Sequence, residues 1–523
     1  MQFYSVAFIA FLVAALVAYY AVGKLAGKGQ WIVLLVASLA FYAYNGIEHF
    51  IFIGTTALST WGASRAFASI AARVKKERMA AESTEAKKAA KKRGTTRKRL
   101  VLAATLLVNF GILAYIKYAT VLVGYLAPES GWKAGILLPL GISFYTFQTI
   151  SYVVDTYNAK YEPERNFAKY LLFVSFFPQL IQGPINRFDE LAHQLYAKRA
   201  LDWYNIRRGL LLAGYGLLKV YAIGNVLVIC LNPILDNINP STPGSLIVMG
   251  ILMYAIYQYA NFSGGIDMVL GFAKMFGIEM APNFRQPYFS VSLTDFWRRW
   301  HITLGAWMRD YVFYPFVFLP GVKKWSRGLT ARFGKHLGRT LPVCVASIIV
   351  FFIVGLWHGA ELHFILWGLY NGLIIAASDL LTPLWARMNK ALHINMEGRA
   401  HHVFCIVRTF IVVNIGWYFD RIVSFGDTIV AFHNTLFSFQ PAAALPLFHT
   451  LTTSVMRGGL VLAGCACIIV LVVSILKERN IDVADKLLSS PAIVRGLAWG
   501  VIIVFVATSF VFARPGGFMY ANF

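Results

Sequence analysis

Five long apolar segments constrain the fold of this chain more than any other feature of its sequence. Each approaches the roughly 20 residues that cross a bilayer as an α-helix. None alternates apolar and polar residues as a barrel strand would, and a bilayer admits only helices or closed barrels. The sequence therefore predicts an all-α, polytopic membrane protein with about ten to thirteen full or partial spans. The five segments are residues 1–22, 101–116, 343–357, 460–476 and 497–512.

The composition agrees with this class, because 58% of the 523 residues are hydrophobic and only 14% are charged. Soluble domains carry about 25% charged residues. No linker of domain size interrupts the chain, so we expect one membrane domain over 1–523. It divides into N-terminal spans (1–125), a polar and Pro/Gly-rich central part (136–375) and C-terminal spans (400–523). Residues 1–22 lack a basic leader and a cleavage site, which predicts a retained first helix.

The five cysteines do not predict a disulfide or zinc framework. They lie within or beside apolar segments, and no two of them form a CxxC pair. We expect them to be small buried hydrophobic side chains. They are Cys230, Cys344, Cys405, Cys465 and Cys467.

The net charge of +24 is concentrated in two segments. Residues 73–99 hold twelve Lys/Arg against three Glu, and residues 321–339 hold six with no acidic residue. Lys and Arg stay on the cytoplasmic side of polytopic proteins, so we expect both segments there and the N-terminus outside a bacterial inner membrane. The Lys-rich stretch 80–92 predicts a polar helix or a flexible loop. Attraction to anionic membrane lipid is a further expectation, whereas nucleic-acid binding is not, because no aromatics interleave the basic residues.

The central part holds the signals of a functional site. Residues 138–157 predict an aromatic helix whose Ser, Gln and Asp face protein or a water-filled cavity. In FVSFFPQLIQGPINRFDEL (173–191), Pro178, Gly183 and Pro184 break a helix inside apolar sequence. A broken helix at membrane depth must line a cavity or be buried in protein, so this segment predicts a re-entrant element.

A second signal is the segment SLTDFWRRWHITLGAWMRDY (292–311). Ser292 and Asp295 have capping-box spacing, which predicts the start of a helix. Arg298, Arg299 and Arg309 lie off an aromatic stripe, so the helix is expected to be amphipathic and basic. His301 lies at the border of the stripe and is expected to point inward. The stripe has helical spacing and consists of Phe296, Trp300, Leu304, Trp307 and Tyr311.

A third signal is His358 in FFIVGLWHGAELHF (351–364), an ionisable residue inside an apolar run. Three interpretations are open: a hydrogen-bonded structural histidine, a metal ligand, and a catalytic base or nucleophile. The spacing of His358, Glu361 and His363 is not that of an HExxH site, which disfavours a metal. Acid–base chemistry fits better, because imidazole can accept and return a proton near neutral pH.

Taken together, FFPQLIQGPINRFDEL, NFSGGIDMVLGFAKMFGIEMAPNF, DFWRRWHITLGAWMRDYVFYP and GLWHGAELHFILWGLYNGL resemble the membrane-bound O-acyltransferase (MBOAT) family. The resemblance runs through about 136–375 and is closest to the bacterial branch with the alginate O-acetylase and the D-alanyl lipoteichoic acid transferase. It implies a ring of about eleven or more helices, with re-entrant elements, around a central tunnel.

The same resemblance implies roles for the two histidines. His358 matches the catalytic histidine of the family, and His301 matches the second histidine of the bacterial branch. His358 would deprotonate an acceptor hydroxyl or carry the acyl group itself, and these two routes stay open. His301 would polarise the acyl carbonyl or orient the acceptor. Further tunnel or substrate candidates are Trp357, Trp300, Arg298, Arg299, Gln182, Asn186, Asp267 and Asn371, for several of which a helix-to-helix hydrogen bond is the plainer account.

The expected function is transfer of an acyl group, most simply acetyl, from a cytoplasmic thioester to a cell-surface polysaccharide. The donor would be acetyl-CoA or an acyl carrier protein, with no bound cofactor or metal, and a secreted or anchored acyltransferase partner of the SGNH type would complete transfer. One alternative is D-alanine transfer from a small acidic carrier to teichoic acid, with the carrier docked on 321–339. Another, of a different class, is a transporter or flippase of a polysaccharide intermediate.

Overall fold

The computed structural model describes residues 3, 5–127, 129 and 139–513. These residues form helices joined by short connections, and the only β-pairing among them is one isolated bridge. The chain separates into two compact units, which we describe one at a time. Unit 1 comprises residues 1–213 and 269–281, and unit 2 comprises 214–268 and 282–518, as far as the structure describes them.

In the described residues, unit 1 contains eight α-helices and parts of two more, α9 (Trp203–Leu217) and α11 (Gly244–Met275), whose remaining parts belong to unit 2. The eight are α1 (Val6–Leu25), α2 (Gln30–Ala43), α3 (Phe50–Ala80), α4 (Thr84–Leu126), α5 (Ile142–Tyr157), α6 (Phe167–Ser175), α7 (Phe177–Gln182) and α8 (Phe188–Tyr196).

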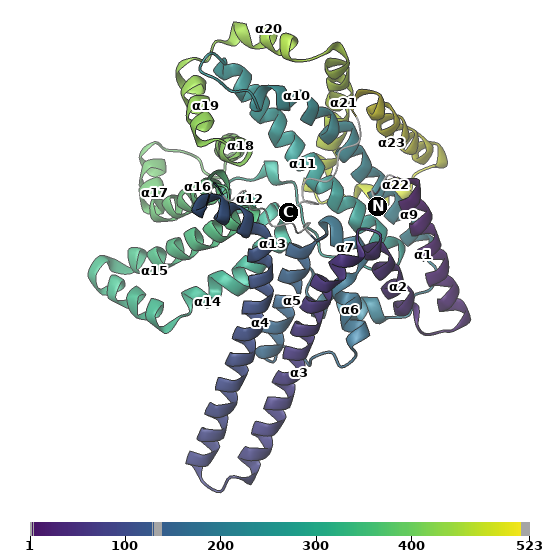
Figure 1. Ribbon diagram of the computed structural model, residues 1–523. Coiled ribbons are helices and arrows are strands. Elements are labelled where there is room, and N and C mark those ends of the chain that lie inside the picture. The colour runs from purple at the N-terminus through teal and green to yellow at the C-terminus, as the bar shows by residue number, and fades with distance from the viewer. Residues whose placement is uncertain (1–2, 4, 128, 130–138, 514–523) are drawn as a thin grey trace. The chain divides into compact units, whose positions relative to one another are not determined.

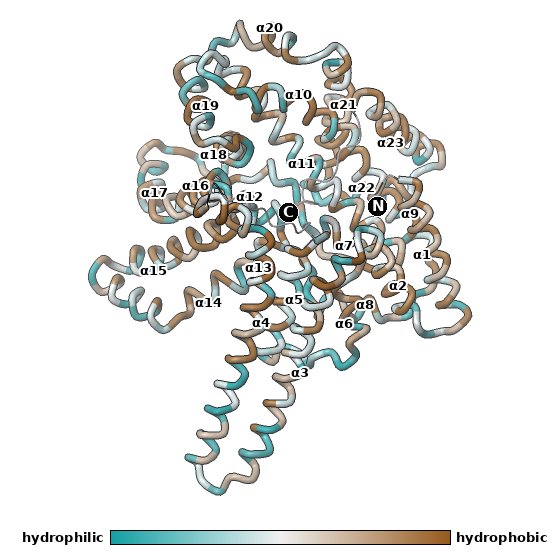
Figure 2. Tube along the Cα trace, in the orientation of Figure 1, coloured by the Kyte–Doolittle hydropathy of each residue, from teal (hydrophilic) through white to brown (hydrophobic). Residues whose placement is uncertain are grey.

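The basic segment 73–99 is a helical hairpin made by the ends of α3 and α4, which lie side by side in Figure 1. Ser83 caps α4, because its hydroxyl accepts a hydrogen bond from the N–H of Ala86 at 3.1 Å. Gly94 lets the two helices approach closely, since a Cβ there would collide with Val74. Most of 80–92 is helical, which agrees with the predicted polar helix and not with the alternative of a flexible loop. The end of the hairpin is hydrophilic (Figure 2).

The broken helix predicted within 173–191 is present. α6 and α7 are followed by extended residues 183–187, and α8 begins after them. The break is buried, and its backbone is held by side chains: the Gln179 amide donates to the carbonyl of Phe173 at 2.7 Å, and Asn186 Oδ1 accepts from the N–H of Ala281 at 3.1 Å. α5 also forms where the aromatic helix was predicted, with residue 138 outside the described residues.

Unit 2 contains the π-helical segments η3 (Leu218–Asn225) and η5 (Arg309–Phe313). Its α-helices are α10 (Val226–Leu235), α12 (Leu293–Arg299), α13 (Ile302–Met308), α14 (Tyr314–Val317), α15 (Pro320–His358), α16 (Leu362–Leu380), α17 (Thr382–Ala391), α18 (Arg399–Arg421), α19 (Phe425–Phe437), α20 (Pro441–Leu451), α21 (Ser454–Glu478), α22 (Val483–Leu488) and α23 (Ala492–Phe512).

The second basic segment, 321–339, is also helical. It forms the first part of α15, which is interrupted at Gly334, where φ is 85° and ψ is 170°. Glycine reaches this conformation without a Cβ clash, so the helix can turn back on itself there. The Ser326 hydroxyl donates to the carbonyl of Gly338 at 2.8 Å and ties the two sides of the turn together.

Eight helices in the described residues are long and apolar enough to cross a membrane, or up to ten if each of two bent helix pairs is one span. Four of the five predicted apolar segments lie within these helices, and so do residues 6–22 of the first, whose residues 1, 2 and 4 are outside the described residues. The number is smaller than the eleven or more helices expected, and the exact count stays a prediction. Large apolar side chains on α21 and α23 are exposed, Val461, Ile468, Ile493 and Val504 among them, which suits a lipid environment.

The cysteines are only partly as predicted. Cys230, Cys344 and Cys405 are buried and unpaired, in agreement with a role as small core side chains. Cys465 is exposed and Cys467 is half-buried, so the expectation of burial is wrong for Cys465. The reason is that α21 presents an apolar face outward, and hydropathy alone does not separate a lipid-facing position from a core position.

Candidate active site

The segment predicted as one helix over 292–311 is two short helices, α12 and α13, separated at His301. His301 has left-handed backbone angles (φ 47°, ψ 52°), which a right-handed helix cannot contain. The predicted N-cap is present, because the Ser292 hydroxyl accepts from the N–H of Asp295 at 3.1 Å. Despite the break, most of the predicted stripe is buried: Phe296, Trp300, Leu304 and Trp307, with Tyr311 half-buried.

The break at His301 is held by a segment that precedes α12. The N–H of Ile302 donates to the carbonyl of Asn283 at 3.0 Å, and the N–H of Arg285 donates to the carbonyl of Arg299 at 2.9 Å. These bonds form the isolated antiparallel bridge between Phe284 and Trp300. The backbone groups freed by the interrupted helix thus have partners, as buried backbone requires.

The imidazole of His301 points inward, as predicted, and is 3% exposed. It packs edge-on against Phe262, with ring centroids 4.8 Å apart, and its Nδ1 lies 3.3 Å from Oδ1 of Asn283. Burial lowers the pKa of His301 to about 3, because an apolar environment disfavours the charged ring. This histidine is therefore neutral at physiological pH.

His358 is the last residue of α15 and is half-buried. The helix end is fixed by close packing of α15 on α16, where Gly355 and Gly368 bring the two backbones together. A Cβ at Gly355 would collide with the carbonyl of Phe364, and one at Gly368 with the carbonyl of Phe351. Small residues at such crossings are typical of helices packed in membranes.

Trp357 packs against both histidines. Its ring centroid lies 6.0 Å from that of His301 and 4.9 Å from that of His358, and its side chain is buried. The structure therefore brings the two predicted catalytic residues to the same tryptophan, from α15 and from the junction of α12 and α13.

A second tryptophan, Trp367 on α16, packs against His358 with ring centroids 4.8 Å apart. Trp297 packs edge-on against Trp367 at 5.5 Å. Asn371 holds this pair: its Oδ1 accepts from the indole N–H of Trp297 at 3.1 Å, and its Nδ2 donates to the carbonyl of Trp367 at 2.9 Å. Asn371 thus lies beside the site through its tryptophan contacts.

A cavity of about 630 Å³ lies beside this aromatic cluster and is lined by His301 and Trp300. Its volume is within the range of ligand pockets. Most of the other lining residues are apolar and come from α13 and α15, while Arg298, Arg309 and Asp379 are charged. His358 is not among the described residues that line the cavity, but it lies one helical turn beyond Val354, which is.

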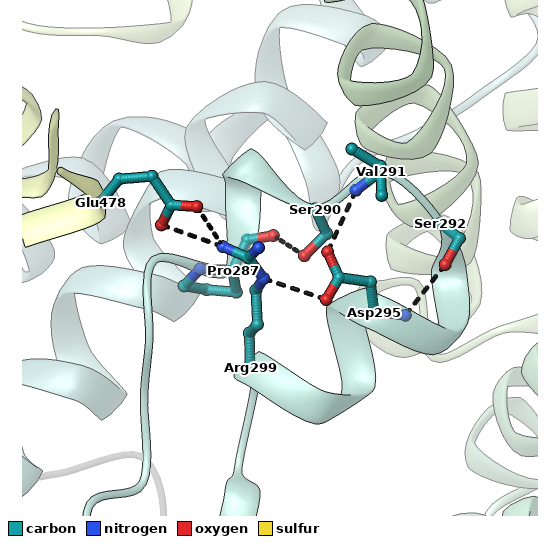
Figure 3. A network of polar contacts seen from close by, with 7 residues as sticks. All are labelled: Pro287, Ser290, Val291, Ser292, Asp295, Arg299 and Glu478. Atoms are coloured by element: carbon teal, nitrogen blue, oxygen red, sulfur yellow. Dashed lines mark hydrogen bonds and ion pairs between the residues drawn. The ribbon is translucent and has the colours of Figure 1, made fainter. Parts of the chain in front are cut away.

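The three predicted arginines have different environments. Arg299 forms an ion-pair network away from the cavity, in which Glu478 accepts two bonds of 2.8 and 3.0 Å and Asp295 accepts one of 3.1 Å (Figure 3). Arg309 is exposed and pairs with Asp310 at 2.9 Å. Arg298 is exposed at the cavity and forms no ion pair within the described residues. Arg298 is therefore the cation best placed to meet an anionic ligand.

The remaining candidates are not among the described residues that line the cavity. Gln182 and Asn186 belong to unit 1, where Asn186 ties the broken helix to residue 281. Asp267 lies in unit 2 and is paired with the buried Lys219 at 2.5 Å, which also donates to the Ser263 hydroxyl at 2.9 Å. These contacts of Asn186 and Asp267 correspond to the interpretation that each residue forms a structural contact between helices.

Two residues of the site were missed in the sequence. Asn283 and Trp367 contact His301 and His358, yet neither has a distinguishing local pattern. Asn283 lies in a Pro-Asn-Phe stretch that reads as a turn, and Trp367 reads as one more apolar residue of a membrane helix. The contact of Asn283 with a residue 18 positions later requires the left-handed turn at His301, which no local signal predicts.

Comparison with known proteins identifies the family. The model of the MBOAT, membrane-bound O-acyltransferase, family matches residues 163–416, which contain both histidines. A probable alginate O-acetylase of Pseudomonas aeruginosa is 31% identical over 87% of this chain and 78% of its own length. A peptidoglycan O-acetyltransferase of Helicobacter pylori is 31% identical over 62% of each chain. A teichoic acid D-alanyltransferase of Bacillus subtilis is 29% identical over 53% of this chain and 67% of its own.

The membrane-crossing helices, the two histidines against Trp357 and these similarities agree with one another, and they show that the chain is a multi-pass O-acyltransferase that belongs to the membrane-bound O-acyltransferase family.

Proposed function

We propose that the protein passes an acetyl group from a cytoplasmic thioester across the membrane for O-acetylation of a cell-surface or extracellular polysaccharide. The observation that carries this proposal is the pair of histidines on either side of Trp357, next to a cavity with the exposed Arg298. The choice of acetyl and polysaccharide is supported by the similarity to proteins named alginate O-acetylase and peptidoglycan O-acetyltransferase.

In the proposed reaction, His358 accepts the proton of an acceptor hydroxyl. The hydroxyl oxygen then forms the ester bond with the acyl carbon, the carbon–sulfur bond breaks, and the leaving thiolate takes the proton. His358 is the C-terminal residue of α15, and the partial negative charge of a helix C-terminus stabilises an imidazole that has gained a proton. The alternative route forms an acyl-imidazole on His358 before the hydroxyl attacks.

The donor is proposed to be acetyl-CoA or the thioester of a carrier protein. Arg298 is suited to a phosphate of either donor, because a guanidinium binds phosphate with two parallel hydrogen bonds. The basic segment at the start of α15, which includes Lys323 and Lys324, would meet an acidic carrier on the cytoplasmic side. A secreted or membrane-anchored acyltransferase of the SGNH type is the partner proposed to receive the acyl group outside. Binding to an acidic carrier that is lost on charge reversal of Lys323 and Lys324 would favour the carrier over acetyl-CoA.

The test compares surface glycans from a deletion strain that carries the wild-type chain, His358→Ala or His402→Ala. His402 is exposed on α18 and serves as the matched control. We expect mass spectrometry to find ester-linked acetate with the wild type and His402→Ala and none with His358→Ala, at equal polymer yield. Loss of the exported polymer itself would indicate a transporter, and ester-linked alanine would indicate D-alanyl transfer.

The two chemical routes are separated by supplying radiolabelled acetyl-CoA to membranes without an acceptor. The covalent route predicts label on the protein that is absent in His358→Ala, whereas the general-base route predicts no label on either.

A further inference from the structure

Asn283 contacts the imidazole of His301 with its side-chain amide, and it is 1% exposed. Its Oδ1 lies 3.0 Å from the backbone N–H of Thr303, 2.9 Å from the Thr303 hydroxyl and 3.3 Å from His301 Nδ1. A backbone N–H can only donate, so the amide atom at this point is the carbonyl oxygen and not the nitrogen. The orientation of the Asn283 side chain is thereby fixed.

This orientation determines the tautomer of His301. A carbonyl oxygen accepts hydrogen bonds and never donates them, so the hydrogen between Asn283 and His301 must be on Nδ1. A neutral imidazole carries one ring hydrogen, which leaves Nε2 with a lone pair. His301 is neutral because of its burial, as described above. Its Nε2 can therefore accept a hydrogen bond and cannot donate one.

The backbone holds the same arrangement. The backbone carbonyl of Asn283 also accepts from the N–H of Ile302, which follows His301 in the chain as Thr303 does. Asn283 therefore contacts the ring of His301 and the two residues after it, while the backbone bond from Arg285 to Arg299 holds the chain before the turn. A residue that orients an active-site histidine through its second nitrogen is a recurrent device, and its loss weakens function without removing the reacting group.

We propose that Asn283 is a positioning residue that keeps His301 in its Nδ1–H tautomer, so that Nε2 accepts a hydrogen bond from a second hydroxyl of the acceptor, next to the hydroxyl that His358 deprotonates. This inference rests on the proposed acyl transfer. Of the two roles that the family resemblance allows for His301, it selects orientation of the acceptor and excludes polarisation of the carbonyl, which would require a donor at Nε2.

The uncharged contacts of the His301 ring permit a test by introducing a charge beside it. Its ring packs against the uncharged Phe262 and Trp357, and the charged groups around the same cavity are Arg298, Arg309 and Asp379. Asn283→Asp keeps an oxygen that accepts all three bonds. It also replaces the Nδ2 group, which donates to no described residue, with a negative charge. A carboxylate beside an imidazole raises the pKa of the imidazole by about one to three units.

The experiment measures transfer of radiolabelled acetyl from acetyl-CoA to polymer in detergent-permeabilised membranes between pH 4.5 and 8.5, values chosen to bracket about two units on each side of an ordinary histidine pKa. Asn283→Asp should retain activity at the alkaline end and lose it on acidification at a higher pH than the wild type does. Asn283→Ala should lose roughly tenfold to a hundredfold in rate at every pH. Thr303→Val removes one bond to Asn283 but not the Asn283–His301 bond, and should keep the wild-type profile.

A wild-type profile in Asn283→Asp, or a near-wild-type rate in Asn283→Ala, would overturn the inference. If the Asn283 variants give either of these results while His358→Ala abolishes transfer, the proposed function stands and only the role of Asn283 fails. If His358→Ala is active, the proposed function itself fails.

A second readout depends neither on activity nor on the Asn283 variants. Nitrogen NMR of the wild-type protein labelled in histidine, with the His301 signal assigned by its loss in His301→Gln, should show the Nδ1–H form. An Nε2–H form or an imidazolium in the wild type would contradict the proposal directly.

Discussion

The buried imidazole of His301 makes the stability of the protein depend on pH. Its pKa in the folded state is about 3, against an ordinary value of 6.5. Below pH 6.5 the unfolded chain therefore binds a proton that the folded chain does not, so stability is complete above pH 6.5 and falls as the pH falls towards 3. The loss should reach about 2 kcal/mol at pH 5. Unfolding in detergent at pH 7 and pH 5 should show this loss for the wild type and a smaller one for His301→Asn. Equal pH dependence in the two proteins would contradict it.

A second prediction at this scale concerns Asn371, which accepts the indole N–H of Trp297 and lies in a buried position. Asn371→Leu leaves that N–H without its acceptor, which should cost about 1 to 3 kcal/mol in free energy of unfolding. Because Trp297 packs on Trp367 and Trp367 packs on His358, acyl transfer should fall as well. Asn371→Asp retains an acceptor oxygen and is the control. The prediction is wrong if both variants lose stability equally.

At the scale of elements, the crossing of α15 and α16 sets the position of His358. A Cβ at Gly355 would meet the carbonyl of Phe364, so Gly355→Ala must push the two helices apart just before the histidine. A displacement of about 1 Å can reduce the rate of a reaction up to a hundredfold. We expect at least a tenfold loss of acyl transfer at normal membrane insertion, measured as ester-linked acetate per unit of protein. Gly464→Ala on α21, where a Cβ would meet nothing, should be silent, and a silent Gly355→Ala would refute the argument.

The elements also show what the sequence could predict and what it could not. The N-cap at Ser292 and most of the buried stripe follow from short spacings, so they could be predicted. The break at His301 could not, because a non-glycine residue adopts left-handed angles only when distant partners hold it there. Here the partner is the segment 283–285. The turn inside α15 had a local cause in Gly334, but a single glycine in a helical pattern is usually tolerated and carries little information.

At the scale of the whole molecule, composition was sufficient to predict a polytopic helical protein, but it could not predict the number of spans. Two helix pairs are bent, by 117° between Gln30–Ala43 and Ile47–Ala80 and by 58° between Leu362–Leu380 and Thr382–Ala391. In a hydropathy profile, each helix pair is one apolar region with an interruption. Such a profile cannot distinguish a broken span from two separate helices. The family, by contrast, could be predicted, because its motifs occur in order along half the chain.

The orientation of the whole chain in the membrane is the last prediction, and it follows from charge. Polytopic proteins keep Lys and Arg on the cytoplasmic side of the membrane. Both basic segments, 73–99 and 321–339, are therefore expected on that side. Lys88 is exposed on α4 and Arg327 lies in the basic start of α15, while Glu48 lies in the turn before α3. In a cysteine-free background, Lys88→Cys and Arg327→Cys should react with a membrane-impermeant maleimide only after the inner membrane is opened. Glu48→Cys should react in intact spheroplasts. Labelling of Lys88→Cys in intact spheroplasts would reverse the orientation and with it the cytoplasmic origin of the acyl donor.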